Sequence, residues 1–183
     1  MEKIGVFFAQ GFEEIEALTV VDIVRRAGMQ ASMISVTDEK EVTGSHGISV
    51  KVDELLSETD FKELSMLVLP GGMPGTMNLE ACEPLMEQLD CFYQSGKYIS
   101  AICAAPSIFG HRGYLKDRNA CSYPTKETEL TGAYLSDRPV EISGHVITSR
   151  GMGTAIDFAL AIVERFLGKE EAVKLAQQIV YKG

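Results

Sequence analysis

Short apolar runs recur along the chain, and the segments between them carry apolar residues at helical spacing. The first run, Ile4 to Ala9, has no polar alternation, which is typical of a strand buried on both faces of a parallel sheet. A hairpin excursion is predicted between Glu41 and Val52, where two glycines stand among β-branched residues. Similar short runs predict four further strands: Ala31 to Val36, Met66 to Leu69, Tyr98 to Ile102 and Val146 to Ser149.

Four segments carry the spacing of amphipathic helices. Apolar residues at i, i+3, i+4 and i+7 predict a helix from about Glu13 to Ala27. Later patterns predict one helix that ends at Gly96, one that ends at Gly168, and one from Lys169 to Val180.

The predicted strands and helices alternate, and no linker or internal repeat interrupts them. This order predicts one domain over residues 1–183 with an α/β fold, a doubly wound, mainly parallel sheet flanked by helices. Ligands of such sheets bind beyond the carboxyl ends of the strands. Gly72 and Cys103 both fall there.

Composition narrows the classes of function. The 183 residues are 45% hydrophobic and 23% charged, which suits one well-cored domain. The formal charge of -9 and the scattered basic residues disfavour a nucleic-acid surface. The N-terminal apolar run is too short for a signal peptide and no run reaches membrane length, so we expect a cytoplasmic protein without membrane contact.

Four cysteines are present, and Cys103 stands out by its position. They have neither a CxxC pair nor histidine spacing, so neither disulfides nor a metal site is predicted. Cys103 follows a predicted strand and precedes Pro106, which suits a first helical turn. A thiol at such a turn faces a helix N-terminus, so we expect a lowered pKa and a reactive thiolate. The alternative is a small buried hydrophobic residue, the interpretation we give to the other three cysteines: Cys82 and Cys91 in a helical segment, and Cys121 in a predicted strand.

Two further features could serve a reactive thiol. Glu16 opens the first predicted helix near the expected place of Cys103, and burial there would keep it protonated. The alternative, that it only complements the helix dipole, stays open. The Gly71-Gly72 turn and the amide after Cys103 could stabilise an oxyanion, or could form only a tight turn.

The chain carries four further motifs: GFEEIE at 11–16, LPGG at 69–72, AICAAP at 101–106 and TSRGMGTAIDFALAIVE at 148–164. Together they resemble the ThiJ/PfpI superfamily. With VDIVRRAG at 21–28 they resemble its branch containing the human Parkinson-disease protein deglycase and bacterial YajL. The resemblance implies a flavodoxin-like fold, a homodimer, a nucleophilic and oxidisable Cys103, a protonated Glu16 bonded to it, and backbone oxyanion donors at Gly72 and Ala104. Gly71 is expected to line the site.

The implied activity is that of a glutathione-independent glyoxalase or protein deglycase without cofactor or metal. It would act on small α-oxoaldehydes or glycated protein side chains, in protection against carbonyl and oxidative stress. Peptidase activity is not expected, because Ala104 stands where the peptidase branch has a histidine. Tyr123 replaces a histidine of the branch near the thiol, and His46 is an outside candidate for the site. The alternatives are a redox-sensing chaperone whose Cys103 is oxidised to sulfinate, and a binding module with an incidental cysteine.

Overall fold

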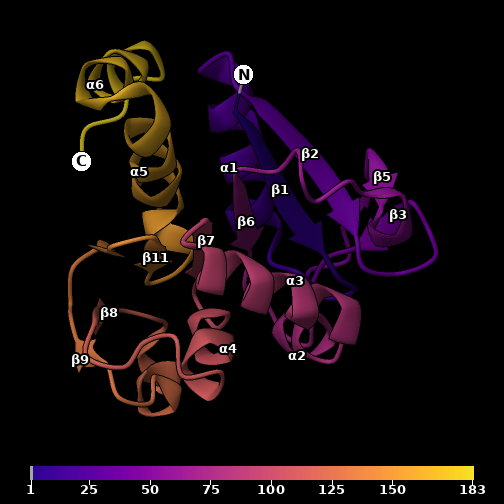
Figure 1. The fold of residues 1–183 in the computed structure, drawn as a ribbon. Helices are drawn as coiled ribbons and strands as arrows, with labels where there is room; N and C mark the ends of the chain where they lie inside the picture. The colour runs from indigo at the N-terminus through magenta and orange to yellow at the C-terminus, as the bar shows by residue number, and fades with distance from the viewer. Residues whose placement is uncertain (1) are drawn as a thin grey trace.

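The computed structural model describes residues 2–183, and a seven-stranded sheet forms its centre (Figure 1). The strands of this sheet are β1 (Lys3–Phe8), β2 (Gln30–Ser35), β5 (Glu54–Leu55), β6 (Met66–Leu69), β7 (Tyr98–Ile102), β10 (Val140–Ser143) and β11 (Val146–Ser149). Their order is β10-β11-β7-β6-β1-β2-β5. Neighbouring strands are parallel except β10 and β11, which form an antiparallel hairpin at one edge.

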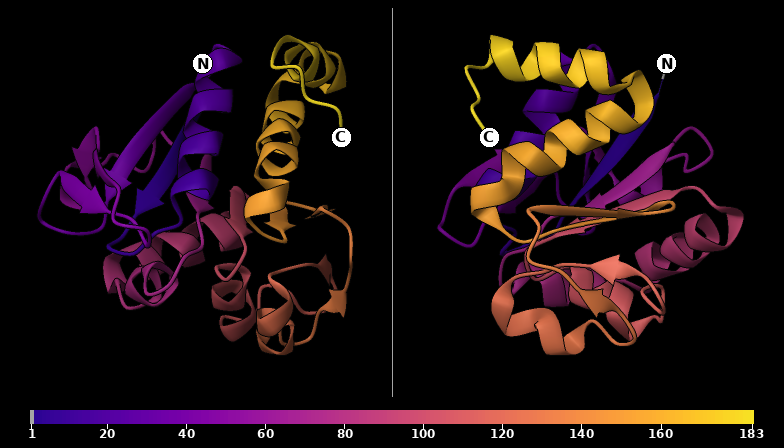
Figure 2. Two further views of the ribbon diagram at one scale, coloured as in Figure 1. Left: turned by 180° about the vertical axis from the view of Figure 1, so that it is seen from behind. Right: turned by 90° about the vertical axis from the view of Figure 1, so that its left-hand side faces the viewer.

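Helices cover both faces of the sheet, so the fold has three layers (Figure 2). On one face α1 and α5 pack against the sheet, with α6 against α5, and on the other face α2, α3 and α4 pack against it. Their bounds are α1 (Glu14–Arg26), α2 (Gly75–Glu80), α3 (Glu83–Ser95), α4 (Pro106–His111), α5 (Ala155–Leu167) and α6 (Lys169–Gln178).

The central strand β1 explains why its sequence has no polar alternation. Val6 and Phe8 belong to the core with Phe158 of α5, whereas Phe7 belongs to the opposite core with Leu89 of α3. Successive side chains point to opposite faces, and both faces are covered by helices. An apolar residue is therefore needed at every position.

Two short sheets lie outside the central one. The antiparallel pair β3 (Glu41–Thr43) and β4 (Ser49–Lys51) confirms the predicted hairpin. The parallel pair β8 (Asn119–Ala120) and β9 (Tyr134–Leu135) was not predicted. Short 3₁₀ helices lie at Leu56–Glu58, Pro124–Glu129 and Met152–Thr154.

The predicted strands and helices are confirmed within a residue or two. The last three predicted strands have the observed ends, and the first two each begin and end one residue early in the structure. The first helix is one residue shorter at each end than predicted, and the last ends at Gln178 instead of Val180. Gly96 ends α3 in the left-handed region, at φ 73°.

Two placements of cysteines were wrong. Cys82 precedes α3 as its N-cap and is not helical, because the segment divides into two helices between Glu80 and Glu83. Cys121 comes directly after β8, outside any strand, although it is buried. Cys91 lies within α3, as predicted.

The parallel order brings distant segments to one edge of the sheet. The chain leaves the carboxyl ends of β1, β6 and β7 at this edge, and these three strands are neighbours. Among residues 2–183, no helix is long and apolar enough to cross a membrane.

Candidate active site

Cys103 occupies a sharp turn directly after β7. Its backbone lies in the left-handed region at φ 65°, which is uncommon for a residue with a side chain. Two bonds hold it there: its N-H donates to the Ser149 carbonyl at 3.0 Å, and its carbonyl accepts from the Tyr123 N-H at 2.8 Å. Pro106 begins α4 three residues later, as predicted. The strand end and the β11 neighbour together fix the direction of the thiol.

Glu16 lies in the first turn of α1 and is fully buried. Its Oε2 accepts a hydrogen bond from the Gly71 N-H at 2.9 Å. Its Oε1 has no hydrogen-bond partner among the described residues. The Cys103 side chain approaches this carboxyl closely enough to shift its pKa. The structure therefore brings the two predicted residues together.

Gly71 fits in the narrow space between these two side chains. A Cβ atom built on it would lie 2.7 Å from the Cys103 Cβ and 2.7 Å from the Glu16 Oε2. Both distances are well inside van der Waals contact, so any side chain here would push the pair apart. Gly71 is a glycine because of this close approach.

Burial dominates the acid-base properties of the pair. It raises the pKa of Glu16 to about 7, against the opposing effect of the hydrogen bonds from Cys103 and Gly71. Burial, the charge of ionised Glu16 and the hydrogen bond to it raise the pKa of Cys103 to about 12. The predicted lowering of the thiol pKa was therefore wrong: α4 has six residues and begins beyond Ala105, so its dipole does not outweigh desolvation.

The two groups titrate as a pair. Two of the three causes that raise the pKa of Cys103 depend on a negative charge at Glu16. A protonated Glu16 removes that repulsion and becomes a donor to the sulfur, which favours the thiolate. Above the pKa of Glu16, at about 7, the pair holds one proton, and the thiolate exists in those molecules whose carboxyl holds it.

Backbone N-H groups approach the sulfur from two loops. The N-H groups of Gly72 and Ala104 bond to Cys103 and oppose the rise of its pKa. Gly72 has φ 91°, and a Cβ on it would lie 2.4 Å from the Glu13 nitrogen. The left-handed turn thus directs this N-H toward the thiol.

Tyr123 and Gly151 lie on the open side of the thiol. A Cβ built on Gly151 would be 3.6 Å from the Tyr123 ring and 3.9 Å from the Cys103 sulfur. Tyr123 is half exposed, so its ring borders the approach to the site. Sequence reasoning missed Gly151 as a neighbour of the thiol, although it follows the carboxyl end of β11.

His46 does not reach the cysteine. Its ring and backbone N-H bond to Glu14 at 3.0 and 2.7 Å, at the start of α1. One ligand atom each of Glu13, Glu14 and His46 lies within 4.8 Å of the others. These atoms already bond to one another or to Ser45, so we assign no metal to the cluster.

The sequence of the chain also matches a known protein family. A family model described as "DJ-1/PfpI family" matches residues 2–165 of the chain. The chain belongs to the DJ-1/PfpI family. This confirms the resemblance to the ThiJ/PfpI superfamily drawn from the motifs, and the flavodoxin-like fold that it implies.

Relatives within the DJ-1/PfpI family match almost the whole chain. "Protein DJ-1 homolog B" of Arabidopsis thaliana is 36% identical over 183 residues, 99% of this chain and 42% of that protein. The chain therefore spans less than half of that relative. "Glutathione-independent glyoxalase DJR-1.2" of Caenorhabditis elegans is 34% identical over 91% of this chain and 89% of that protein. The solved structure of oxidized Toxoplasma gondii DJ-1 is 34% identical, with a TM-score of 0.95 and 100% of both chains covered.

Substitution Gly71→Ala tests the close approach in this DJ-1/PfpI protein. The new methyl group would collide with Cys103 and Glu16, so we expect a loss of about 1 to 3 kcal/mol in the free energy of unfolding. Gly153→Ala is the matched control, because a Cβ there meets nothing within 4 Å. Urea denaturation measures both variants, and equal stability of the two would contradict the geometry.

Substitution Glu16→Gln tests the raised pKa of the buried carboxyl. In the wild type, the folded state holds the proton more tightly than the unfolded chain, so its stability falls as pH rises from 4.5 to about 7. Glutamine does not titrate. The variant should therefore gain up to about 3 kcal/mol relative to wild type between pH 4.5 and 8.

Urea denaturation at several pH values measures this difference. Glu87→Gln, an exposed position of α3, serves as the control and should show no such gain. A constant difference between wild type and Glu16→Gln over the whole range would refute the raised pKa.

Proposed function

We propose that the chain is a cofactor-independent, cysteine-dependent glyoxalase or deglycase. Its substrates would be α-oxoaldehydes of the methylglyoxal type, or their adducts with protein side chains. The observation that carries the proposal is the buried Cys103–Glu16 pair, which holds a nucleophile and a proton-transfer group side by side. A relative with 34% identity is named a glutathione-independent glyoxalase, which supports this class of chemistry.

The first step in this proposal forms a bond between sulfur and the aldehyde carbon. With the proton on Glu16, the Cys103 thiolate adds to the aldehyde of methylglyoxal. The aldehyde oxygen becomes an alkoxide and takes the proton from Glu16, giving a neutral hemithioacetal. The N-H groups of Gly72 and Ala104 stabilise the negative oxygen while it exists.

The second step moves one proton between neighbouring carbons. The Glu16 carboxylate now takes the proton from the hemithioacetal carbon and returns it to the former ketone carbon, while the hydroxyl proton passes from the first oxygen to the former ketone oxygen. The product is a 2-hydroxy thioester, and no external oxidant or reductant is needed because one carbon is oxidised as the other is reduced. Water then cleaves the thioester, which releases lactate and restores the thiol with its proton.

Peptide hydrolysis is not part of the proposal. A cysteine peptidase needs an imidazole bonded to the thiol. The ring nitrogens of His46 and His111 bond to Ser45, Glu14 and Glu80, and His145 precedes β11, at the end of the sheet opposite Cys103. The free thiols in the described part of the chain fit the reducing cytoplasm, where we place the proposed protection against carbonyl and oxidative stress.

Methylglyoxal consumption and lactate formation without glutathione test the proposed activity. Cys103→Ser should abolish turnover, because the hydroxyl is a far weaker nucleophile, and Glu16→Gln should lower it at least about 100-fold. Cys91→Ser, which removes an exposed thiol on α3, should retain wild-type turnover. Absence of turnover in wild type, together with selective peroxide oxidation of Cys103, would instead favour the redox-sensing chaperone.

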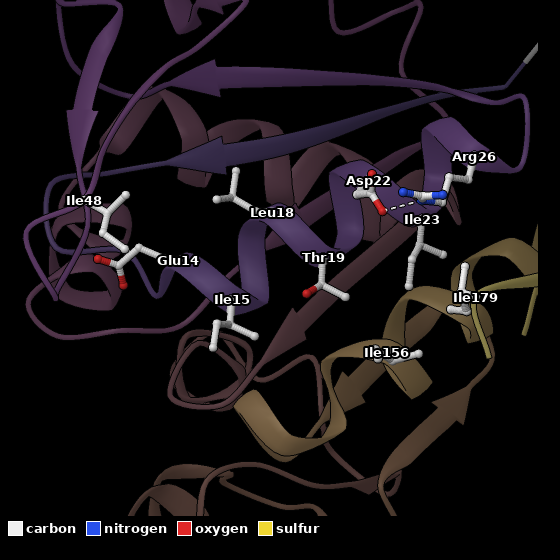
Figure 3. A pocket seen from close by; sticks show the side chains of 10 residues that line it. All are labelled: Glu14, Ile15, Leu18, Thr19, Asp22, Ile23, Arg26, Ile48, Ile156 and Ile179. Carbon is white, nitrogen blue, oxygen red and sulfur yellow. Dashed lines mark hydrogen bonds and ion pairs between the residues drawn. The ribbon is translucent and has the colours of Figure 1, made fainter. Parts of the chain in front are cut away.

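We also propose a homodimer through the face of α1. A pocket of about 640 Å³ runs along this helix, and Ile156 and Ile179 lie across it from Ile23 (Figure 3). Ile15 and Ile48 on its border are 50% and 55% exposed. A second copy related by a two-fold axis would bury the same apolar residues on both partners, which favours self-association over exposure to water.

Substitution Ile48→Lys tests the proposed interface. It puts a charge into the apolar contact and should raise the dissociation constant of the dimer at least about tenfold. Ile142→Lys is the matched control, because Ile142 is also half exposed but lies on β10. Sedimentation velocity over a range of concentrations measures both. A wild type that remains monomeric throughout would contradict the proposal.

A further inference from the structure

A second carboxylate, Glu13, is connected to the Cys103–Glu16 pair through Gly71. Its backbone N-H donates to the Gly71 carbonyl at 2.9 Å, and the Gly71 N-H donates to Glu16. Its side chain is 14% exposed and turns toward the β3–β4 hairpin. The Ser45 hydroxyl donates to the Glu13 Oε2 at 3.2 Å, and the His46 Nδ1 lies 3.6 Å from the same oxygen.

The β3–β4 hairpin is hydrogen-bonded to the start of α1 through His46 and Glu14. Glu14 is buried and accepts bonds from the backbone and the ring of His46. A Cβ on Gly44 would lie 2.3 Å from the Glu14 Oε1, so the loop can approach only because Gly44 has no side chain. The bonds to Glu14 therefore fix the position of the His46 ring, although the ring itself is exposed.

We propose that Glu13 is a positioning residue for the Cys103–Glu16 pair. His46 on the hairpin adjusts the effect of Glu13 by partly neutralising the negative charge of that carboxylate. This inference deepens the proposed function and rests on the role given there to the pair. Glu13 touches neither thiol nor substrate in this scheme. It acts through the field that it exerts on Glu16 and through its bond to the Gly71 loop.

The charges that face each group fix the direction of the effect. Glu16 is faced by Cys103 and Glu13, and the Glu13 charge contributes to raising the pKa of Glu16. Glu13 is faced by His46 from the hairpin, by Glu16 from α1, and by Glu14, one of whose oxygens lies within 4.8 Å of a Glu13 oxygen. The hydrogen bond to Glu14 and the charges of Glu13 and Glu14 raise the pKa of His46. The ring therefore stays positively charged to a higher pH than an ordinary histidine does.

Opposite charges should then have opposite effects on the shared proton. Glu13→Gln removes a negative charge beside Glu16, so the Glu16 carboxyl should lose its proton more easily. The proton of the pair then favours sulfur, and the thiolate fraction falls. His46→Gln removes the balancing positive charge, so it should hold the proton on Glu16 more firmly and increase the thiolate fraction.

Two readouts without any substrate test this inference. The carboxyl ¹³C shift of Glu16 gives the midpoint of its titration, and mass spectrometry gives the pH profile of Cys103 alkylation by iodoacetamide. Glu13→Gln should lower the Glu16 midpoint by roughly half a unit to one unit and slow alkylation at pH 7. His46→Gln should move both readouts the other way, and His46→Arg should keep the midpoint at or below that of wild type.

Ser45→Ala is the matched control. It removes a hydrogen bond to Glu13 without changing any charge, so it should leave the midpoint unchanged. A purely structural role would loosen the hairpin in all variants and move their midpoints in one direction, which would overturn the proposal. A Glu13→Gln midpoint equal to that of wild type would overturn it as well.

The two proposals fail in different ways. A protein without glyoxalase turnover still has a Glu16 midpoint and an alkylation profile, so the charge inference can be tested when the proposed activity is absent. If Glu13→Gln does not fold, the opposite signs expected for His46→Gln and His46→Arg decide the question.

Discussion

Burial of the Glu16 carboxyl is the constraint on which the rest of the site depends. Removing a carboxylate from water is expensive unless it is paired with a positive charge or protonated. Within residues 2–183, its one nitrogen donor is the Gly71 N-H. Protonation, with the thiol as partner, is the arrangement that such surroundings favour. The missing side chain of Gly71 and the left-handed turn at Cys103 both serve to bring these two groups together.

The topology supplies this arrangement without long loops. The segments that carry Glu16, Gly71 and Cys103 follow β1, β6 and β7, which lie side by side in the sheet. Because all three strands are parallel, their carboxyl ends meet at one edge, and the chain turns there into α1, α2 and α4. The buried strands therefore fix distances that flexible loops would leave variable.

The sequence predicted the central strands well, because burial on both faces leaves an unmistakable apolar run. It missed the two-residue strands β5, β8 and β9, which are too short to show any period. It also missed the edge strand β10, where the buried residue is Glu141 and no apolar run appears. It placed Glu16 and Cys103 correctly, because the ends of parallel strands converge. It gave the wrong direction for the thiol pKa, since the depth of burial and the charge of a neighbour depend on tertiary structure. The partner of His46 was beyond sequence reasoning for the same reason.

Glu14 and Glu16 show how far the surroundings can separate the pKa values of two identical side chains. On α1, successive residues are rotated by about 100°, so Glu14 points under the hairpin and Glu16 toward the thiol. Burial opposes ionisation of Glu14, but its bonds from His46 and the hairpin backbone prevail and lower its pKa to about 2. Glu16 has one backbone donor, the Gly71 N-H, and burial outweighs it and raises the pKa of Glu16 to about 7. One carboxyl thus remains a fixed anion that holds a loop, whereas the other keeps a proton available near neutral pH.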